Sequence, residues 1–243
     1  MLKKRLSITG KQVLPPKLTA VSVIGPSHVR KGIPNQDACL VRSKGTLHLA
    51  VVSDGVGSCP LSHIGSRCLC EAVSRVVFRS QSSVLNPALI FDAIRDDWLR
   101  QIKPLTYRAA SATCLFALSN GKHVFVAMLG DGAIGLLHGD GVVEVLSENK
   151  STAFSNITNS MTERTRIEEW QYRCYPVGEL YGVMLATDGV ADDLSLPEDF
   201  VKEILHSVNK TGTLLGRHHM REMLINWPVP KHSDDKTIAC MIF

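Results

Sequence analysis

The sequence predicts an α+β fold, with two antiparallel β-sheets packed as a sandwich and flanked by helices on both sides. Short apolar runs bounded by turn residues form separate blocks, and segments with apolar residues at helical spacing follow each block. Such segregation of strands from helices is typical of α+β domains. The chain has 243 residues, 44% of them hydrophobic, which is enough for one sizeable core. We therefore expect a single domain over residues 18–243, preceded by a basic tail of residues 1–17.

The first block is expected to contain three strands followed by two helices. Its third strand reads Leu-His-Leu-Ala-Val-Val, an apolar run with the length of a buried strand. Gly25 and Pro26 are expected to close the first strand. Asn86 is the candidate N-cap of the second helix, with Pro87 in its first turn. The expected strands are residues 18–24, 38–42 and 47–52, and the expected helices are residues 61–78 and 87–102.

The rest of the chain is expected to hold four closely spaced strands, a long loop, a strand, two helices and a last strand. Asn120-Gly121 is a strong hairpin signal, and Gly139-Asp140-Gly141 marks a second hairpin. Residues 147–170 are polar and weakly periodic, so they form either a functional flap or an ordinary polar loop. The expected strands are residues 112–118, 123–128, 133–138, 142–146, 182–186 and 236–243, and the expected helices are residues 197–207 and 213–225.

Charge and cysteine content argue against several classes of protein. The basic tail accounts for the formal charge of +4, because the chain after residue 19 holds 22 basic against 23 acidic residues. We therefore expect no nucleic-acid surface. No apolar stretch is long enough to span a bilayer, and none follows the basic N-terminus as in a signal peptide. The seven cysteines include no CxxC pair, so reduced thiols and a cytoplasmic location are expected.

Aspartates follow or precede apolar runs at five places along the chain. Each one alone is usually a simple turn, because Asp and Gly suit turn backbones. Carboxylates at strand ends, spread over about two hundred residues, instead suggest one shared site, and oxygen ligands of this kind suit Mg²⁺ or Mn²⁺. The five aspartates are Asp37, Asp54, Asp131, Asp188 and Asp234.

The ordered set of motifs resembles the metal-dependent protein phosphatase 2C family over about residues 20–243. The stretch from Gly25 to Ala38 is similar to a bacterial branch of that family. The resemblance implies the sandwich fold and a serine/threonine phosphatase that hydrolyses phosphomonoesters through a metal-activated water. The matching motifs are Gln36-Asp37-Ala38, Asp54-Gly55-Val56-Gly57, Gly130-Asp131, Asp188-Gly189 and Asp234-Asp235-Lys236-Thr237.

The resemblance also implies a role for each aspartate. Asp54 would bridge two ions, Mg²⁺ or Mn²⁺, and the Gly55 carbonyl would complete one coordination shell. Asp188 and Asp234 would hold one ion and Asp37 the other. Asp131 would help to bind a third, weaker ion. Asp37, Asp54, Asp188 and Asp234 are thus the predicted catalytic residues, with Gly55 and Asp131 as further metal ligands.

Glycines and departures from the family pattern carry further expectations. Gly55 and Gly57 are expected to allow close backbone approach and positive φ. Gly32 stands where many members carry an arginine that grips the substrate phosphate, and His28 and Arg30 are the nearby candidates for that role. His28 is equally well interpreted as a core or turn histidine.

Three further positions also differ from the family pattern. Val56 replaces a histidine found in eukaryotic members, so the leaving alkoxide would need another acid. Gln36 replaces a common glutamate, and Asp235 replaces a common asparagine.

The resemblance implies a phosphoprotein substrate and, as partners, a cognate serine/threonine kinase or the targets of that kinase. We expect a monomer. Two alternatives remain open at this stage. One is a phosphatase-like regulatory module that binds without catalysis, which the missing arginine favours and the retained aspartates oppose. The other is a phosphohydrolase of small molecules.

Overall fold

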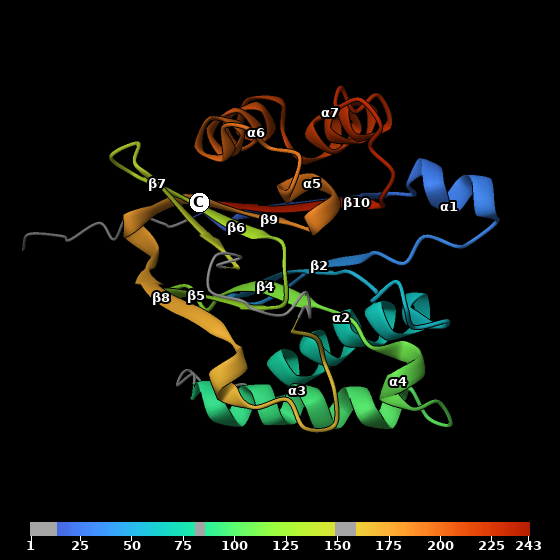
Figure 1. Cartoon of the computed structure of the whole chain (residues 1–243). Helices are drawn as coiled ribbons and strands as arrows, with labels where there is room; N and C mark the ends of the chain where they lie inside the picture. The colour runs from blue at the N-terminus through green and yellow to red at the C-terminus, as the bar shows by residue number, and fades with distance from the viewer. Residues whose placement is uncertain (1–13, 81–85, 149–158) are drawn as a thin grey trace, which may run out of the picture.

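Two antiparallel sheets of five strands lie face to face between two helical layers in the computed structural model (Figure 1). The structure describes residues 14–80, 86–148 and 159–243. The predicted sandwich is confirmed. Residues 1–13, which make up most of the expected tail, and residues 149–158 of the expected loop lie outside the described residues.

The first sheet joins strands from both ends of the chain. Its order is β1-β10-β9-β6-β7, and every neighbouring pair is antiparallel. The strands are β1 (Lys17–Val23), β6 (Ala133–His138), β7 (Val143–Ser147), β9 (Leu180–Ala186) and β10 (Lys236–Ile242).

The second sheet contains two hairpins, one formed by its first and second strands and one by its third and fourth strands. Its order is β2-β3-β4-β5-β8, again antiparallel throughout. The strands are β2 (Ala38–Lys44), β3 (Leu47–Ser53), β4 (Cys114–Ser119), β5 (His123–Leu129) and β8 (Gln171–Pro176).

Helices cover the outer face of each sheet (Figure 1). The outer face of the first sheet is covered by α5 (Asp188–Ala191), α6 (Pro197–Thr211) and α7 (Thr213–Ile225). The second sheet is covered by α2 (Ser62–Ser80), α3 (Pro87–Gln101) and α4 (Tyr107–Ala110). The predicted cap of α3 is confirmed, because the side chain of Asn86 accepts a hydrogen bond of 3.1 Å from the Ala88 amide. Within the described residues, no helix is both long and apolar enough to cross a membrane.

The apolar runs of the strands are explained by burial on both faces. In β3, Leu49 and Val51 pack against the helical layer, whereas Ala50 and Val52 pack against the first sheet. All four side chains have no exposed surface. A strand buried on both faces reads as continuously apolar, because successive side chains point to opposite faces.

Several short elements differ from the sequence predictions. Pro26 does not close a strand but begins helix α1 (Pro26–Lys31), and Gly32 ends this helix in the left-handed region at φ 65°. Strand β8 was not predicted, because this edge strand is exposed along much of its length. The helices α4 and α5 each have four residues, too few for a periodic pattern. Short 3-10 helices at Ile167–Glu169 and Val177–Glu179 flank β8.

Candidate metal centre

The predicted aspartates gather at one edge of the sandwich, and both sheets supply them. In the second sheet, Asp37 directly precedes β2 and Asp54 directly follows β3, and the pairing of Ala38 with Ser53 brings these two ends together. In the first sheet, Asp188 follows the end of β9 and Asp234 precedes the start of β10. Asp131 lies in the turn that connects β5 of one sheet to β6 of the other.

Three carboxylates lie close enough to share one cation. Asp54, Asp131 and Asp188 each place an oxygen atom within 4.8 Å of the other two. The backbone holds two of them in place. The Asp54 amide donates to Thr113 Oγ1 at 3.0 Å, and Asp188 Oδ1 accepts from the Gly189 amide at 2.7 Å.

Asp37 is the most deeply buried of the five aspartates, with 4% of its surface exposed. Its Oδ2 accepts a hydrogen bond of 2.8 Å from Thr187 Oγ1, and this hydroxyl accepts one of 3.0 Å from the Thr237 amide. Asp37 Oδ1 is buried and has no donor among the described residues. A buried carboxylate oxygen without a partner is costly, so this atom points to a ligand that the protein alone does not supply.

Burial and mutual repulsion raise the pKa values of the clustered carboxyls. Burial, followed by the charge of Asp131 and then of Asp234, raises the pKa of Asp188 to about 7. Burial raises the pKa of Asp37 to about 6. Burial, then the charges of Asp37 and Asp188, raises the pKa of Asp54 well above its ordinary value. A divalent cation among these groups would relieve both costs.

The donor set fits Mg²⁺ or Mn²⁺. Carboxylate oxygens predominate, and such hard ligands suit these cations better than soft metals. The partnerless oxygen of Asp37 and the repulsion within the cluster are both relieved by a bound ion. Asp37, Asp54, Asp131 and Asp188 are therefore the residues that could hold the metal, with Asp234 at the exposed edge of the cluster.

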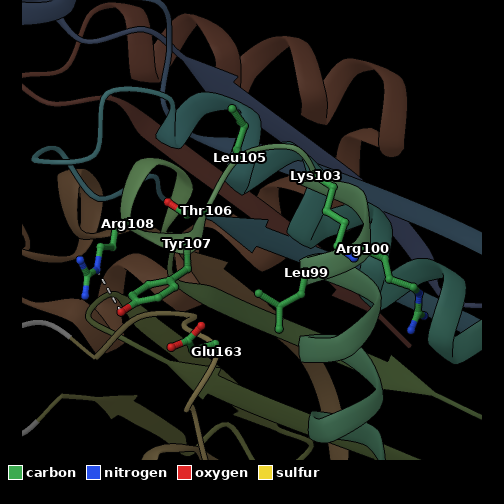
Figure 2. Close-up of a pocket in the computed structure, with 8 residues that line it drawn as sticks. All are labelled: Leu99, Arg100, Lys103, Leu105, Thr106, Tyr107, Arg108 and Glu163. Atoms are coloured by element: carbon green, nitrogen blue, oxygen red, sulfur yellow. Dashed lines mark hydrogen bonds between the residues drawn. The ribbon is translucent and has the colours of Figure 1, made fainter.

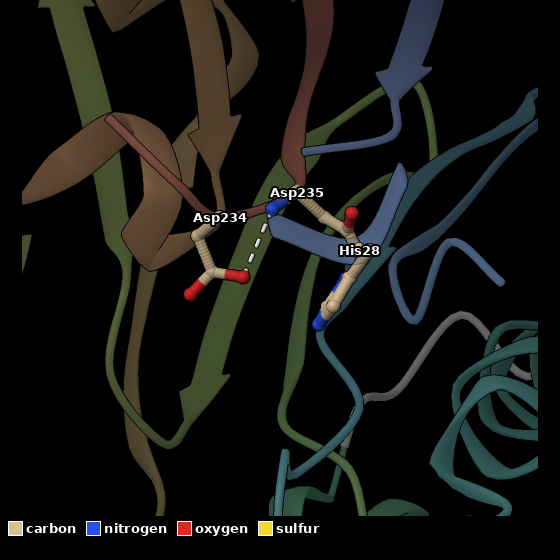
Figure 3. Close-up of side chains that lie close together, drawn as sticks. All are labelled: His28, Asp234 and Asp235. Carbon is tan, nitrogen blue, oxygen red and sulfur yellow. Dashed lines mark hydrogen bonds and ion pairs between the residues drawn. The ribbon is translucent and has the colours of Figure 1, made fainter. Parts of the chain in front are cut away.

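Both carboxylate oxygens of Asp235 accept hydrogen bonds from protein groups. Its Oδ1 accepts from the Gly25 amide at 2.6 Å, and its Oδ2 accepts from the Gln36 amide at 2.6 Å. His28 Nδ1 lies 2.9 Å from the same Oδ2. Figure 3 shows the His28 ring beside Asp235 and the Asp234 carboxylate accepting from the Asp235 amide; one ligand atom of each of the three residues lies within 4.8 Å of the other two.

Of the two predicted phosphate-binding residues, His28 is thus paired with a carboxylate, while Arg30 is exposed on the same helix α1. His28 is 14% exposed at its side chain. The interpretation of His28 as a packed histidine is supported by this pairing, although its partner is a carboxylate rather than the backbone. Phosphate binding by His28 or Arg30 stays a prediction.

Two glycines of the motifs, Gly55 and Gly189, are needed because neighbouring atoms leave no room for a Cβ. A Cβ on Gly55 would lie 2.7 Å from Ser62 Cβ, and a Cβ on Gly189 would overlap the Asp235 carbonyl oxygen. Gly57 faces open space. The expectation of positive φ at Gly55 and Gly57 is wrong, because the left-handed region is occupied instead by Gly130 and Gly132, on either side of Asp131.

With this geometry in place, comparison with known proteins identifies the family. The family model described as protein phosphatase 2C matches residues 24–225. The chain belongs to the protein phosphatase 2C family. No curated protein matches the chain in sequence.

Solved structures of phosphatases share the fold of this phosphatase 2C chain. The serine/threonine phosphatase Stp1 from Staphylococcus aureus has 17% sequence identity and a TM-score of 0.65, over 100% of this chain and 99% of that chain. The catalytic domain of the phosphatase PstP, in complex with two manganese ions, has 15% identity and a TM-score of 0.63, over 94% and 98%. The photosystem II phosphatase PBCP has 14% identity and a TM-score of 0.67, over 94% and 98%.

Two threonines of this phosphatase 2C site were not predicted as functional residues. Thr187 orients the Asp37 carboxylate, and Thr113 fixes the backbone of Asp54 from both sides, since its amide also donates to the Asp54 carbonyl at 2.8 Å. Thr187 directly precedes Asp188 in its motif, which was the available signal. Nothing in the sequence connects Thr113 with Asp54, because strand pairing alone brings them together.

Proposed function

We propose that this phosphatase 2C chain is a metal-dependent serine/threonine protein phosphatase with Mg²⁺ or Mn²⁺ at the cluster described above. Asp37, Asp54, Asp188 and Asp234 are the catalytic metal ligands, with the Gly55 carbonyl and Asp131 as further ligands. The observation that carries the proposal is the buried Oδ1 of Asp37. It lacks a donor among the described residues and lies among carboxyls with raised pKa values.

The residues of the chain organise the reaction. Bound divalent ions supply charge neutralisation at the phosphate and a water that loses its proton readily. Asp54 and Asp188 would hold these ions, and Thr187 fixes the orientation of the Asp37 carboxylate by donating a hydrogen bond to it. Water attacks phosphorus in line with the leaving serine or threonine oxygen. A new P–O bond forms as the P–O bond to that oxygen breaks, and the proton lost by the water ends on the leaving oxygen, which gives the free hydroxyl and inorganic phosphate. No side chain forms a covalent intermediate.

We assign phosphate binding to His28 and Arg30 on α1. Both are on the helix that follows β1, and the next segment leads directly into Asp37. A guanidinium can bind phosphate oxygens in a bidentate manner. Both residues precede Gly32, which stands where the family pattern has an arginine.

We further propose that the protein acts as a cytoplasmic monomer on phosphoproteins, opposite a serine/threonine kinase or on its targets. The cytoplasmic assignment is supported by the cysteines. All seven are free, and four of them are buried. Free thiols are typical of reducing compartments.

Hydrolysis of a phosphothreonine peptide tests the proposed function. We expect phosphate release with Mn²⁺ and none with EDTA. Asp54→Asn should abolish turnover, whereas Asp140→Asn, at an exposed hairpin position whose side-chain oxygen can still accept from Val142, should not. Metal binding seen as a rise in Tm without turnover on any phosphopeptide would contradict the proposal and favour a binding module. Turnover restricted to small phosphate esters would favour a small-molecule phosphohydrolase.

A further inference from the structure

A pocket of about 670 Å³ opens between α3, α4 and the segment that leads to the 3-10 helix Ile167–Glu169 (Figure 2). Its apolar lining comes from Leu99 of α3, Leu105 of the connecting turn and Tyr107 of α4. All three side chains are partly buried against the core of the second helical layer. The pocket is therefore large enough, and apolar enough, to take a side chain from a partner.

The charges around this pocket are mainly positive. Arg100, Lys103 and Arg108 are exposed residues of the lining, and Glu163 is its acidic residue. Arg100 is held by Asp97 at 2.8 Å, and Arg108 donates to the Tyr107 hydroxyl at 3.3 Å while facing the charge of Glu163. In Figure 2, Arg108 lies on one side of the Tyr107 and Leu99 side chains, and Lys103 lies on the other. An occupant with carboxylates on both sides of an apolar side chain would match this arrangement.

The pocket is connected to the metal centre by a short stretch of chain. The Asn159 carbonyl packs against Gly130, the neighbour of Asp131, where a Cβ would lie 2.7 Å from it. Two residues later, the Met161 amide donates to the Ala112 carbonyl at 2.8 Å, and the Met161 carbonyl accepts from Ser111 Oγ at 2.7 Å. Glu163 then reaches the pocket. The path from Asn159 ends in a turn at Glu163, so it spans at most about 13 Å. A peptide of about four residues would therefore reach from Gly130, the neighbour of Asp131, to the pocket.

We propose that this pocket binds an acidic segment of the phosphoprotein substrate, three to five residues (about 10–17 Å of extended chain) from the phosphorylated residue. The inference rests on the proposed function and adds a substrate class to it. An apolar side chain of the segment fills the space between Leu99, Leu105 and Tyr107. Carboxylates on either side of it pair with Lys103 and Arg108. Glu163 Oε1 lies 3.8 Å from Arg164 Nε, and its charge also acts on Arg108, so it competes with the substrate carboxylates and limits the affinity.

Two phosphothreonine peptides test this inference. One carries Asp-Leu-Asp and the other Lys-Leu-Lys at the proposed distance from the phosphothreonine, and p-nitrophenyl phosphate serves as a substrate too small to reach the pocket. We expect wild type with Mn²⁺ to prefer the acidic peptide. Lys103→Gln combined with Arg108→Gln should raise its KM about threefold to tenfold, because each exposed ion pair contributes modestly and the variant removes two of them. Hydrolysis of p-nitrophenyl phosphate should not change.

Two variants sharpen the test. Glu163→Gln should lower the KM of the acidic peptide, because it removes the competing charge beside Arg108. Lys122→Gln is the control: it removes one positive charge at an exposed lysine in the hairpin between β4 and β5, outside the pocket lining, and should not change the KM of the acidic peptide.

The outcomes separate the inference from the proposed function. Equal KM values for the acidic peptide in wild type and in the double variant would overturn the pocket as a substrate site while p-nitrophenyl phosphate is still hydrolysed. An absence of hydrolysis of all three substrates would overturn the proposed function itself. Fluorescence anisotropy of the acidic peptide lacking phosphate provides a measurement independent of turnover, and binding that the double variant retains in full would also overturn the inference.

Discussion

His28 Nδ1 and Asp235 Oδ2 lie 2.9 Å apart, and Asp235 directly follows the predicted metal ligand Asp234. The Asp235 carboxylate, with 1% of its surface exposed, also accepts hydrogen bonds from the amides of Gly25 and Gln36. One buried carboxylate thus joins the start of α1, the residue before Asp37 and the start of β10. Two predicted metal ligands, Asp37 and Asp234, are each one residue from this junction.

Asp235→Asn should therefore weaken both the fold and the metal centre. Both backbone groups donate hydrogen bonds, and an amide side chain can accept at its oxygen only, so one donor would be left facing an NH₂ group. We expect the free energy of unfolding to fall by about 1–3 kcal/mol, measured by urea denaturation in EDTA. Mn²⁺ affinity, measured by calorimetry, should fall as well. An unchanged midpoint in urea would show that the junction is not needed.

Thr187→Val tests the orientation of Asp37. Valine keeps the shape of threonine but removes the hydroxyl that donates to Asp37 Oδ2 and accepts from the Thr237 amide. Loss of such a supporting hydrogen bond typically costs about 10–100-fold in metal affinity. Thr187→Ser keeps the hydroxyl and should bind Mn²⁺ nearly as well as wild type. Equal affinities for the valine and serine variants would contradict the role.

The metal-free protein should lose stability as the pH rises from about 4 to 7. The folded-state pKa values of Asp37, about 6, and Asp188, about 7, lie above the ordinary value of 3.8. The folded state therefore binds more protons than the unfolded state in this range, and the free energy of unfolding falls with rising pH. Below about pH 4 the carboxyls of Asp37 and Asp188 are protonated in both the folded and the unfolded state, so their burial no longer lowers the free energy of unfolding.

Asp188→Asn isolates this effect from other titrating groups. In EDTA we expect the variant to become more stable than wild type as the pH rises, by about 2–4 kcal/mol near pH 7, measured by urea denaturation at several pH values. With saturating Mn²⁺ the order should reverse, because wild type alone keeps the full ligand set. A difference that does not depend on pH in EDTA would contradict the electrostatic interpretation.

Gly55 and Gly57 provide a matched pair within one motif. Gly55→Ala places a methyl group 2.7 Å from Ser62 Cβ at the start of α2, whereas Gly57→Ala meets open space. We expect Gly55→Ala to lower the free energy of unfolding by about 1–3 kcal/mol through overpacking and to reduce turnover. Gly57→Ala should have little effect on either, in parallel urea and phosphatase assays. Equal losses in the two variants would refute the close-approach argument.

The sequence predicted the layered fold because its strands are long, apolar and separated by clear turns. The sequence does not show that successive side chains of β3 point into two different cores, because all four residues from Leu49 to Val52 are apolar. Helix α1 escaped prediction although Pro26 at its first position and Gly32 at its end match the known preferences of helix termini. Its six residues show no buried stripe that would reveal a helical period.

The centre was predicted through its aspartates, each of which carries a local turn signal. Its supporting residues were not predicted, because their roles arise from contacts across the sheets. Thr113 and Asp54 are 59 residues apart, and Asp235 and Gly25 are 210 apart. The tie between His28 and Asp235 depends on the same long-range packing, and no spacing rule connects two residues so distant along the chain.

The position of β10 within the first sheet determines when during biosynthesis the centre can form. Strand β10 lies between β1 and β9 and pairs with both. Its residue Ile242 pairs with Lys17 of β1, and its residue Ile238 pairs with Ala186 of β9. On the ribosome, β1 emerges long before the strand that it pairs with, and such distant pairings form slowly. Until residues 236–242 have been synthesised, Asp234 and Asp235 have no sheet to hold them. The nascent chain therefore lacks part of the proposed metal centre until this strand has entered the sheet, and we expect phosphatase activity only after that step.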